Sequence, residues 1–245
     1  MVLFGDYHTH TVFSHGKGTI EDNVKVAVEK GLKQIAITDH GFNHGLYAVK
    51  REKVKEMRAE VERLKKVYDI DILLGIEANL ISYDGTIDLT EDEIKLFDII
   101  LVGYHKTFKA KTFKDRILFI LRSLFPTKRA KRKNTMAYIN CLNKYDIDTI
   151  VHLNYGFKVN AVEIAKLAKE KHTYIELNGK RTEFPKNEVE EMVKNETMFI
   201  IDSDAHTPQS VGEVNHPHNF MIMNNIPSKL VVNYNGQVQL KNHKG

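Results

Sequence analysis

The stretch DYHTHTVFSHG, residues 6–16, places three histidines within eight positions near the start of the chain. The residues before it, VLFG, are mostly apolar, so we expect a short strand that ends in polar side chains. Alternation along a strand points Asp6, His8 and His10 to one face, with His15 following in the loop. The spacing indicates a cation site at the end of the first strand.

The same arrangement recurs along the chain, because apolar runs alternate with segments of helical pattern. Strands are predicted within residues 2–10, 33–40, 71–80, 97–105, 147–153, 173–179 and 197–207, and helices over about 21–31, 46–68, 134–145, 160–170 and 186–195. Such alternation predicts parallel strands joined by right-handed helical crossovers. Seven units favour a closed α/β barrel over an open sheet. An Asn-Gly pair within 231–245 predicts a peripheral hairpin.

The composition is that of one sizeable globular domain. The 245 residues are 42% hydrophobic and 28% charged, and Cys141 is the single cysteine. An internal disulfide and a thiolate-rich zinc site are therefore excluded, so a metal site would use His, Asp and Glu. The sequence has no signal-peptide pattern, no apolar run of membrane-spanning length and no phosphate-binding glycine motif, and we expect a cytoplasmic protein without a nucleotide cradle.

Metal-competent side chains end nearly every predicted strand. They are His8 and His10 with His15 behind them, Asp39, His40, Glu77, His105, His152, Asp204 and His206. In a parallel barrel the carboxyl ends of the strands meet on one face, so these residues should converge. A single histidine at such a place is usually structural, but the coincidence at five strands favours a shared metal site. The remaining histidines His44, His172, His216, His218 and His243 are interpreted as ordinary loop, strand-start or tail residues.

The motifs HTH, SHG, TDHG, GIEAN, GYHK, VHLN and DSDAHT, in this order, resemble the signature of the PHP (polymerase and histidinol phosphatase) family of metal-dependent phosphoesterases. The small single-domain bacterial phosphatases of that family are the most similar. The resemblance implies a distorted (β/α)7 barrel of the TIM-barrel-like PHP fold. It also implies one PHP domain over residues 1–245, with a basic insertion at about 106–133.

The resemblance further implies three divalent metal ions, which we expect to be Zn²⁺, with Mn²⁺ or Fe²⁺ as alternatives. One ion would be held by His8, His10, Glu77 and Asp204, a second by His15, His40 and His206, and a third by Glu77, His105 and His152. Glu77, Asp204 and His206 are predicted to be catalytic. A hydroxide shared by the ions would attack phosphorus. Asp6 and Asp39 are expected to orient imidazoles, and Lys106, Lys180 and Arg181 to bind phosphate.

Residues 106–133 contain eleven Lys or Arg and one acid, Asp115, while four phenylalanines interleave the cations. This pattern is compatible with a lid or subunit contact, with nucleic-acid binding, or with a helix at a membrane surface.

The leading prediction is a phosphatase acting on a phosphate monoester of a small metabolite, in a chain that could form an oligomer. A nuclease or nucleotide phosphodiesterase is the alternative. A metal-binding module without activity is disfavoured, because such a module would lack ligands and none is missing here. An amidohydrolase is disfavoured, because no predicted strand ends in an obvious lysine that could bridge two metal ions.

Overall fold

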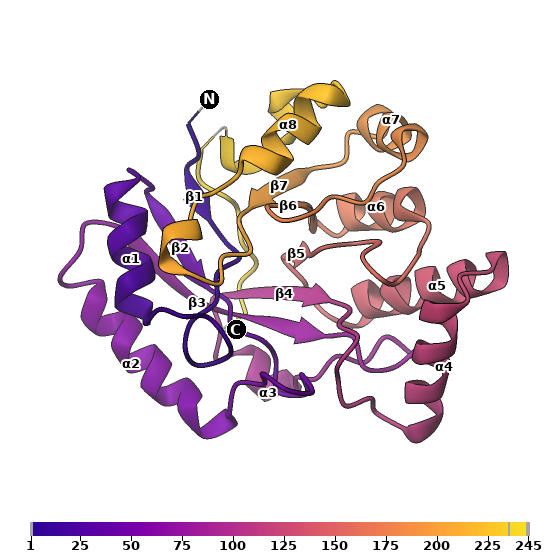
Figure 1. Cartoon of the computed structure of the whole chain (residues 1–245), viewed down its shortest axis with the longest axis horizontal. Coiled ribbons are helices and arrows are strands. Elements are labelled where there is room, and N and C mark those ends of the chain that lie inside the picture. The colour runs from indigo at the N-terminus through magenta and orange to yellow at the C-terminus, as the bar shows by residue number, and fades with distance from the viewer. Residues whose placement is uncertain (1, 235, 244–245) are drawn as a thin grey trace.

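Seven parallel strands form one sheet whose spatial order follows the sequence. The computed structural model describes residues 2–234 and 236–243 (Figure 1). The strands are β1 (Gly5–Asp6), β2 (Gln34–Ile37), β3 (Asp71–Asn79), β4 (Ile99–Gly103), β5 (Thr149–Ile150), β6 (Tyr174–Asn178) and β7 (Phe199–Asp202), each hydrogen-bonded to the next. The sheet curls into a nearly closed barrel, which confirms the predicted distorted (β/α)7 fold.

The seam between the first and last strands is closed by a few specific contacts. The chain beyond β1 pairs with the chain beyond β7 through His10 N to Ala205 O at 2.8 Å and Ala205 N to His8 O at 3.2 Å. Earlier along both strands, the buried Asn233 side chain donates to Gly5 O and to Ile201 O. These bonds set β1 and the chain after it beside β7.

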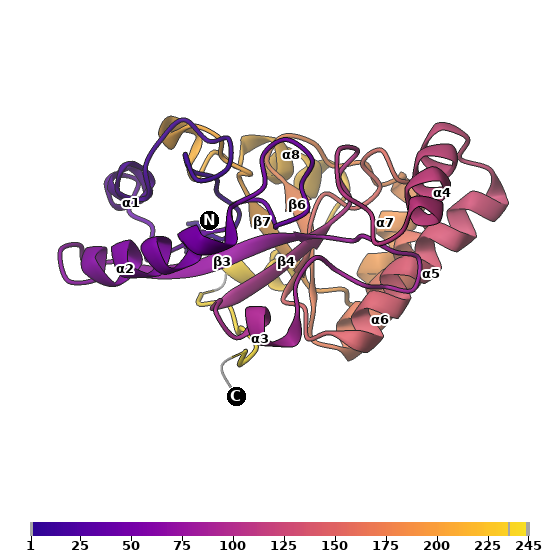
Figure 2. The same ribbon diagram turned by 90° about the horizontal axis from the view of Figure 1, so that it is seen from below.

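Helices cover the outside of the barrel (Figures 1 and 2). They are α1 (Ile20–Glu29), α2 (Val54–Leu64), α3 (Glu91–Ile94), α4 (Phe113–Leu124), α5 (Lys128–Lys144), α6 (Ala161–Glu170), α7 (Lys186–Lys194) and α8 (Asn215–Met223). α1 illustrates how sequence sets these elements: Thr19 and Asp22 form a reciprocal capping box, and Ile20, Val24 and Ala27 give the helix its buried face. No helix within residues 2–234 and 236–243 has the length and apolarity needed to cross a bilayer.

Three local predictions require correction. The helix expected at 134–145 begins earlier, at Lys128, where Thr127 caps it. The helix expected at 46–68 is shorter, with a 3-10 turn at Arg51–Lys53 before α2. His216 and His218 lie on α8 and not in a loop, because Pro217 falls in the first helical turn, where a missing N–H costs nothing.

The carboxyl-terminal tail, which follows α8 and is described at 231–234 and 236–243, closes the amino-terminal end of the barrel. No strand forms in its described parts, 231–234 and 236–243, so the hairpin prediction is wrong there; Asn235 lies outside the described residues. Val238 is buried and belongs to the same core cluster as Tyr7, Leu101 and Ile200. His243 Nε2 lies 2.6 Å from Asp148 Oδ2. The tail is therefore part of the core and not peripheral.

Candidate active site

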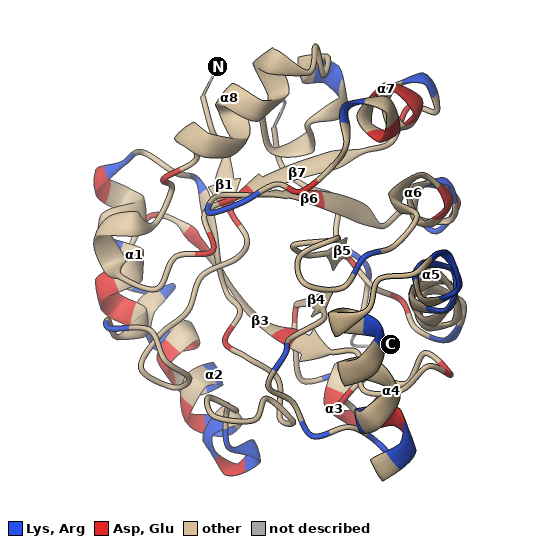
Figure 3. Cartoon of the chain, turned by 45° about the vertical axis from the view of Figure 1, so that its right-hand side comes forward, with Lys and Arg blue, Asp and Glu red and all other residues tan. Residues whose placement is uncertain are grey.

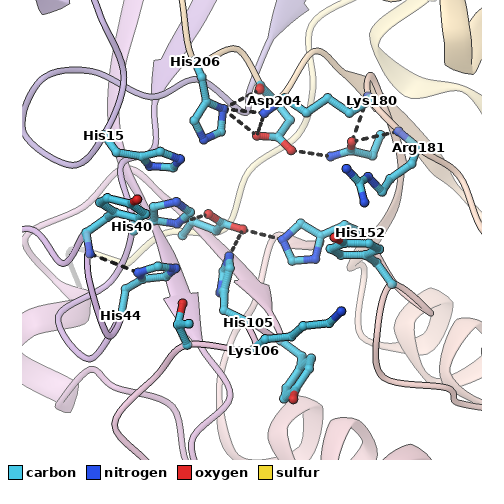
Figure 4. Close-up of a pocket in the computed structure, with 16 residues that line it drawn as sticks. His15, His40, His44, His105, Lys106, His152, Lys180, Arg181, Asp204 and His206 are labelled. Atoms are coloured by element: carbon cyan, nitrogen blue, oxygen red, sulfur yellow. Dashed lines mark hydrogen bonds and ion pairs between the residues drawn. The ribbon is translucent and has the colours of Figure 1, made fainter. Parts of the chain in front are cut away.

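A cavity of about 340 Å³ opens at the carboxyl ends of the strands (Figure 4). Its lining includes Glu77 on β3 and side chains from the loops after the other six strands, namely His15, His40, His105, His152, Lys180, Arg181, Asp204 and His206. His8 and His10 are fully buried beside it and contact its acids. All nine predicted metal positions are thus brought together within one site.

Glu77 occupies the centre of the site and is fully buried at the end of β3. Its Oε1 lies 2.6 Å from His152 Nε2 and 3.1 Å from His105 Nε2. Its Oε2 lies 2.6 Å from His40 Nδ1. The same oxygen is 3.6 Å from His8 Nε2 and 3.7 Å from His10 Nε2. One carboxylate therefore faces five imidazoles, as a bridging ligand would.

Asp204 is the second acid of the site. Its Oδ1 lies 3.4 Å from His10 Nε2 and 3.9 Å from His8 Nε2, so these three side chains form a compact group of potential ligand atoms. Asp204 has φ 53° and His152 has φ 34°, a left-handed backbone that is costly for residues with a Cβ. Such strain is retained where the fold needs a side chain in one position, and here it turns both side chains toward the centre.

The imidazoles of His15, His40 and His206 gather on the other side of Glu77. The His15 ring centroid is 4.8 Å from that of His40 and 4.1 Å from that of His206. His44, interpreted from sequence as an ordinary loop residue, also joins the site, since it forms a potential ligand group with His40 and His105. Its position could have been anticipated only from its closeness to the TDH motif.

Three side chains that the sequence analysis missed hold potential metal ligands from behind. Glu176 on β6 is buried, accepts from His152 N at 2.6 Å and lies 2.6 Å from His8 Nδ1. Asn79 Oδ1 lies 2.8 Å from His105 Nδ1, and Asn178 Nδ2 donates to Asp204 Oδ2 at 3.3 Å. In the sequence, the signal that could have identified Glu176 is a glutamate inside the strand-like run TYIELNG.

The predicted roles of Asp6 and Asp39 are wrong. Asp6 accepts hydrogen bonds from the backbone of Ser203 and Gly212 and so joins β1 to the chain after β7. Asp39 accepts from Thr11 N at 2.7 Å and from Thr11 Oγ1 at 2.6 Å. These carboxylates fix the loops that carry the histidines, while Glu176 and Asn79 orient imidazole rings.

Protonation within the site follows burial and mutual contact. Burial lowers the pKa of His15 to about 4 and of His40 to about 3. Burial alone would raise the pKa of Glu77, but the surrounding imidazoles of His105, His40 and His8 hold it well below its usual value. For His8, burial is outweighed by the carboxylates of Glu176, Glu77 and Asp204, which raise its pKa. The site therefore favours ionised acids beside mostly neutral imidazoles.

The arrangement fits divalent metal ions. His8 Nε2 and His10 Nε2 are buried and have no hydrogen-bond partner within the described residues. Leaving such atoms unpaired costs free energy, which a cation bound by their lone pairs would recover. Nitrogen and carboxylate donors without thiolates are the ligands of Zn²⁺, Mn²⁺ and Fe²⁺ in hydrolytic sites.

Comparison with known proteins agrees with this geometry. The model of the PHP domain matches residues 6–180, which is most of the chain. The chain belongs to the PHP-domain family. A probable phosphatase from Clostridium novyi is 28% identical over 240 residues, covering 93% of this chain and 89% of that protein. A probable phosphatase from Shewanella piezotolerans is 30% identical over 229 residues, with 87% and 82% covered.

The PHP fold is also found among solved structures. Histidinol phosphate phosphatase from Lactococcus lactis, complexed with zinc, L-histidinol and phosphate, superposes with a TM-score of 0.62 at 17% identity, covering 91% of this chain and 94% of that one. The structure of a protein named as a putative histidinol phosphatase from Listeria monocytogenes gives a TM-score of 0.54 at 16% identity, with 85% of this chain and 97% of that one covered. Family membership and the names of the relatives confirm the prediction of a metal-dependent hydrolase acting on phosphoric esters.

In this PHP domain three cations line one wall of the cavity. Lys180 Nζ lies 3.1 Å from Asp204 Oδ1, close to the potential metal ligands. The Arg181 guanidinium stacks over the Tyr155 ring at 4.2 Å from its centroid, and Lys106 Nζ lies 5.7 Å from the same centroid. Two of the cations predicted from sequence to bind phosphate, Lys106 and Arg181, therefore flank one aromatic ring, while Lys180 lies beside Asp204.

Proposed function

We propose that this PHP domain hydrolyses a phosphate monoester of a small metabolite at a site holding three divalent cations, most simply Zn²⁺. The observation that carries the proposal is the Glu77 carboxylate, buried among five imidazoles with Asp204 beside them. We also propose that residues 1–245 are one such domain and that 106–133 is an insertion in it.

The donor groups divide into three sets around this carboxylate. His8, His10, Glu77 and Asp204 would hold one ion, His15, His40 and His206 a second, and Glu77, His105 and His152 a third. The compact groups of His8, His10 and Asp204 and of Glu77, His105 and His152 support the first and third sets. In the second region, His40 and His206 form such a group with His10. Bound ions supply Lewis acidity, lower the pKa of water and neutralise phosphoryl charge.

The chain's own side chains account for binding and orientation. Lys106, Lys180 and Arg181 face the cavity beside the ligand groups, so they can receive the phosphoryl oxygens or a second anionic group of the substrate. Tyr155 holds the Arg181 guanidinium plane in place. Tyr47, stacked on His15 at 4.3 Å between centroids, provides an apolar wall for the alcohol half. A cavity of about 340 Å³ suits a metabolite of modest size.

The nuclease alternative receives less support from the geometry. Of the basic segment 106–133, Lys106 and Thr107 are the described residues that line the cavity. The other cations of the segment belong to α4, α5 and the turns beside them. No continuous basic track leading from these helices into the pocket is defined by the lining residues, so we favour a small phosphomonoester.

The test is a Glu77→Gln substitution, which keeps the shape of the side chain and removes its charge. We expect bound metal per chain, measured by emission spectroscopy, to fall by at least one ion. Hydrolysis of p-nitrophenyl phosphate and of a panel of phosphorylated metabolites should fall about 1,000-fold or more, because loss of a bridging ligand disrupts the electrostatic stabilisation of the reaction.

Glu188→Gln is the matched control, since Glu188 is a buried glutamate on α7 that pairs with Lys131 at 2.7 Å, away from the site. The control should retain metal and activity. Fewer than two bound ions in the wild type, or full turnover in Glu77→Gln, would refute the proposal. Hydrolysis of single-stranded oligonucleotides without hydrolysis of any monoester would favour the nuclease.

A further inference from the structure

The outer face of α4 carries large apolar side chains that nothing in the described chain covers. Phe113 is 78% exposed and Leu124 is 66% exposed, while Ile117, Ile120 and Leu121 are each at least 40% exposed. With 3.6 residues per turn, these five positions fall within an arc of about 100°. The opposite side of α4 buries Phe119, which packs against Tyr83, Tyr104 and Phe157. The helix is therefore anchored by one face and presents an apolar stripe on the other.

Cations border this stripe and continue onto α5. Lys114 and Arg116 lie on its two sides along the helix, and the first turns of α5 add four exposed cations: Lys128, Arg129, Arg132 and Lys133. None of these four has a carboxylate within ion-pairing distance in the part of the chain that the structure describes. Asp115, the one acid of the segment, caps α4 through its bonds with Thr112. The charge of this region is thus uncompensated.

The two features share one protruding part of the molecule. In Figure 1, α4 and α5 lie at one edge of the barrel, with the start of α5 pointing outward. Figure 3 shows Lys and Arg at the ends of α4 and along the start of α5, with an uncharged stretch in the middle of α4. The apolar stripe and the cations therefore lie on neighbouring helices at the same edge of the molecule.

We propose that this α4–α5 face, made of the apolar stripe and the six cations around it, docks on an anionic lipid bilayer. An apolar stripe flanked by Lys and Arg is the pattern of helices that lie in the membrane interface, where the apolar groups enter the acyl boundary and the cations meet lipid phosphates. Docking here would bring the barrel to the membrane surface without a spanning segment.

Two other partners fit the face less well. A second copy of the chain would set the same uncompensated cations against each other across a twofold axis, which is unfavourable. Single-stranded nucleic acid binds through aromatic platforms between cations, but Ile117, Ile120, Leu121 and Leu124 make the stripe mainly aliphatic. Charge and apolar chemistry together favour the anionic bilayer.

The experiment is sedimentation of the full chain with vesicles of phosphatidylcholine, with and without phosphatidylglycerol. We expect binding to the anionic vesicles that weakens with added salt and is about tenfold or more weaker on pure phosphatidylcholine. The double variant Phe113→Asp/Leu124→Asp should lose binding to the anionic vesicles. The triple variant Arg129→Gln/Arg132→Gln/Lys133→Gln should bind about 100-fold more weakly, since each cation near an anionic surface contributes a comparable increment.

Matched controls separate the face from general charge and hydrophobicity. Met223→Asp removes an equally exposed apolar side chain on α8, and Lys166→Gln/Lys171→Gln/Lys194→Gln removes three exposed cations on another side; both should bind as the wild type does. Thermal melting checks that every variant is folded.

Three outcomes would overturn the proposal. They are equal binding to neutral and anionic vesicles, an oligonucleotide bound in a way that the apolar double variant leaves unchanged, and a dimer in light scattering that the double variant dissociates while vesicles do not bind.

Discussion

Glu176 stands directly behind two imidazoles of the site, 2.6 Å from His8 Nδ1 and bonded to His152 N. A carboxylate in this place fixes the ring of a metal-binding histidine and increases the basicity of its other nitrogen. Substituting Glu176→Gln should weaken metal affinity about 10- to 100-fold, measured by competition with a chromogenic chelator.

The control for this variant is again Glu188→Gln, because Glu188 is a buried glutamate that accepts from Lys131 Nζ and from Ala161 N and not from a histidine. Unchanged metal affinity in Glu176→Gln would mean that Glu176 only supports the fold. Restored activity at higher metal concentration would instead identify it as a positioning residue.

At the level of single residues, the sequence identified most of the side chains that line the site but not the side chains that hold them in position. His8, Glu77 and Asp204 were identifiable because the carboxyl ends of parallel strands converge. Glu176 was not, because its contact with His8 joins positions 168 apart and depends on how the barrel curls. His44 was ambiguous for the same reason, since its loop could have turned away from His40.

The carboxyl-terminal tail acts as a structural element although its described residues form no strand. Val238 lies among the residues that fill the barrel, so shortening it removes buried methyl groups and leaves a cavity. Val238→Ala should lower the free energy of unfolding by about 2 kcal/mol, measured by denaturant titration.

Val67→Ala provides the comparison, because Val67 is 59% exposed and should change the stability little. Equal effects of the two substitutions would place Val238 outside the cooperative core. The tail was misread from sequence because an Asn-Gly pair reports a local turn preference, whereas burial of Val238 depends on Tyr7, more than 200 positions earlier.

The pH response of the whole molecule should depend on the buried imidazoles. Burial and the nearby His105 lower the pKa of His44 from 6.5 to about 4, and its Nδ1 accepts from Tyr47 N at 3.2 Å. Below pH 6.5 the unfolded chain therefore binds a proton on His44 that the native chain does not bind. Between pH 7.5 and 5.5 this difference should cost the metal-free protein up to about 1.4 kcal/mol of stability.

The measured quantity is the change in unfolding free energy across this range for chelator-treated wild type and His44→Gln. The raised pKa of His8 acts in the opposite direction, so the difference between the two proteins isolates His44. We expect a smaller loss in His44→Gln, while His216→Gln, an exposed histidine on α8, should match the wild type. Identical slopes for all three proteins would contradict the prediction.

The seam between β1 and β7 also determines the stage of folding at which the site can form. It joins residues far apart in sequence, as in the 2.8 Å bond from Tyr7 N to Asp202 Oδ1, 195 positions away. Closing so long a loop is slow and comes after local helices and neighbouring strand pairs have formed. Because His8 and His10 reach Asp204 only across this seam, no partly folded chain can assemble the complete set of donors. Ion binding would then follow folding instead of guiding it, and its free energy would chiefly slow unfolding.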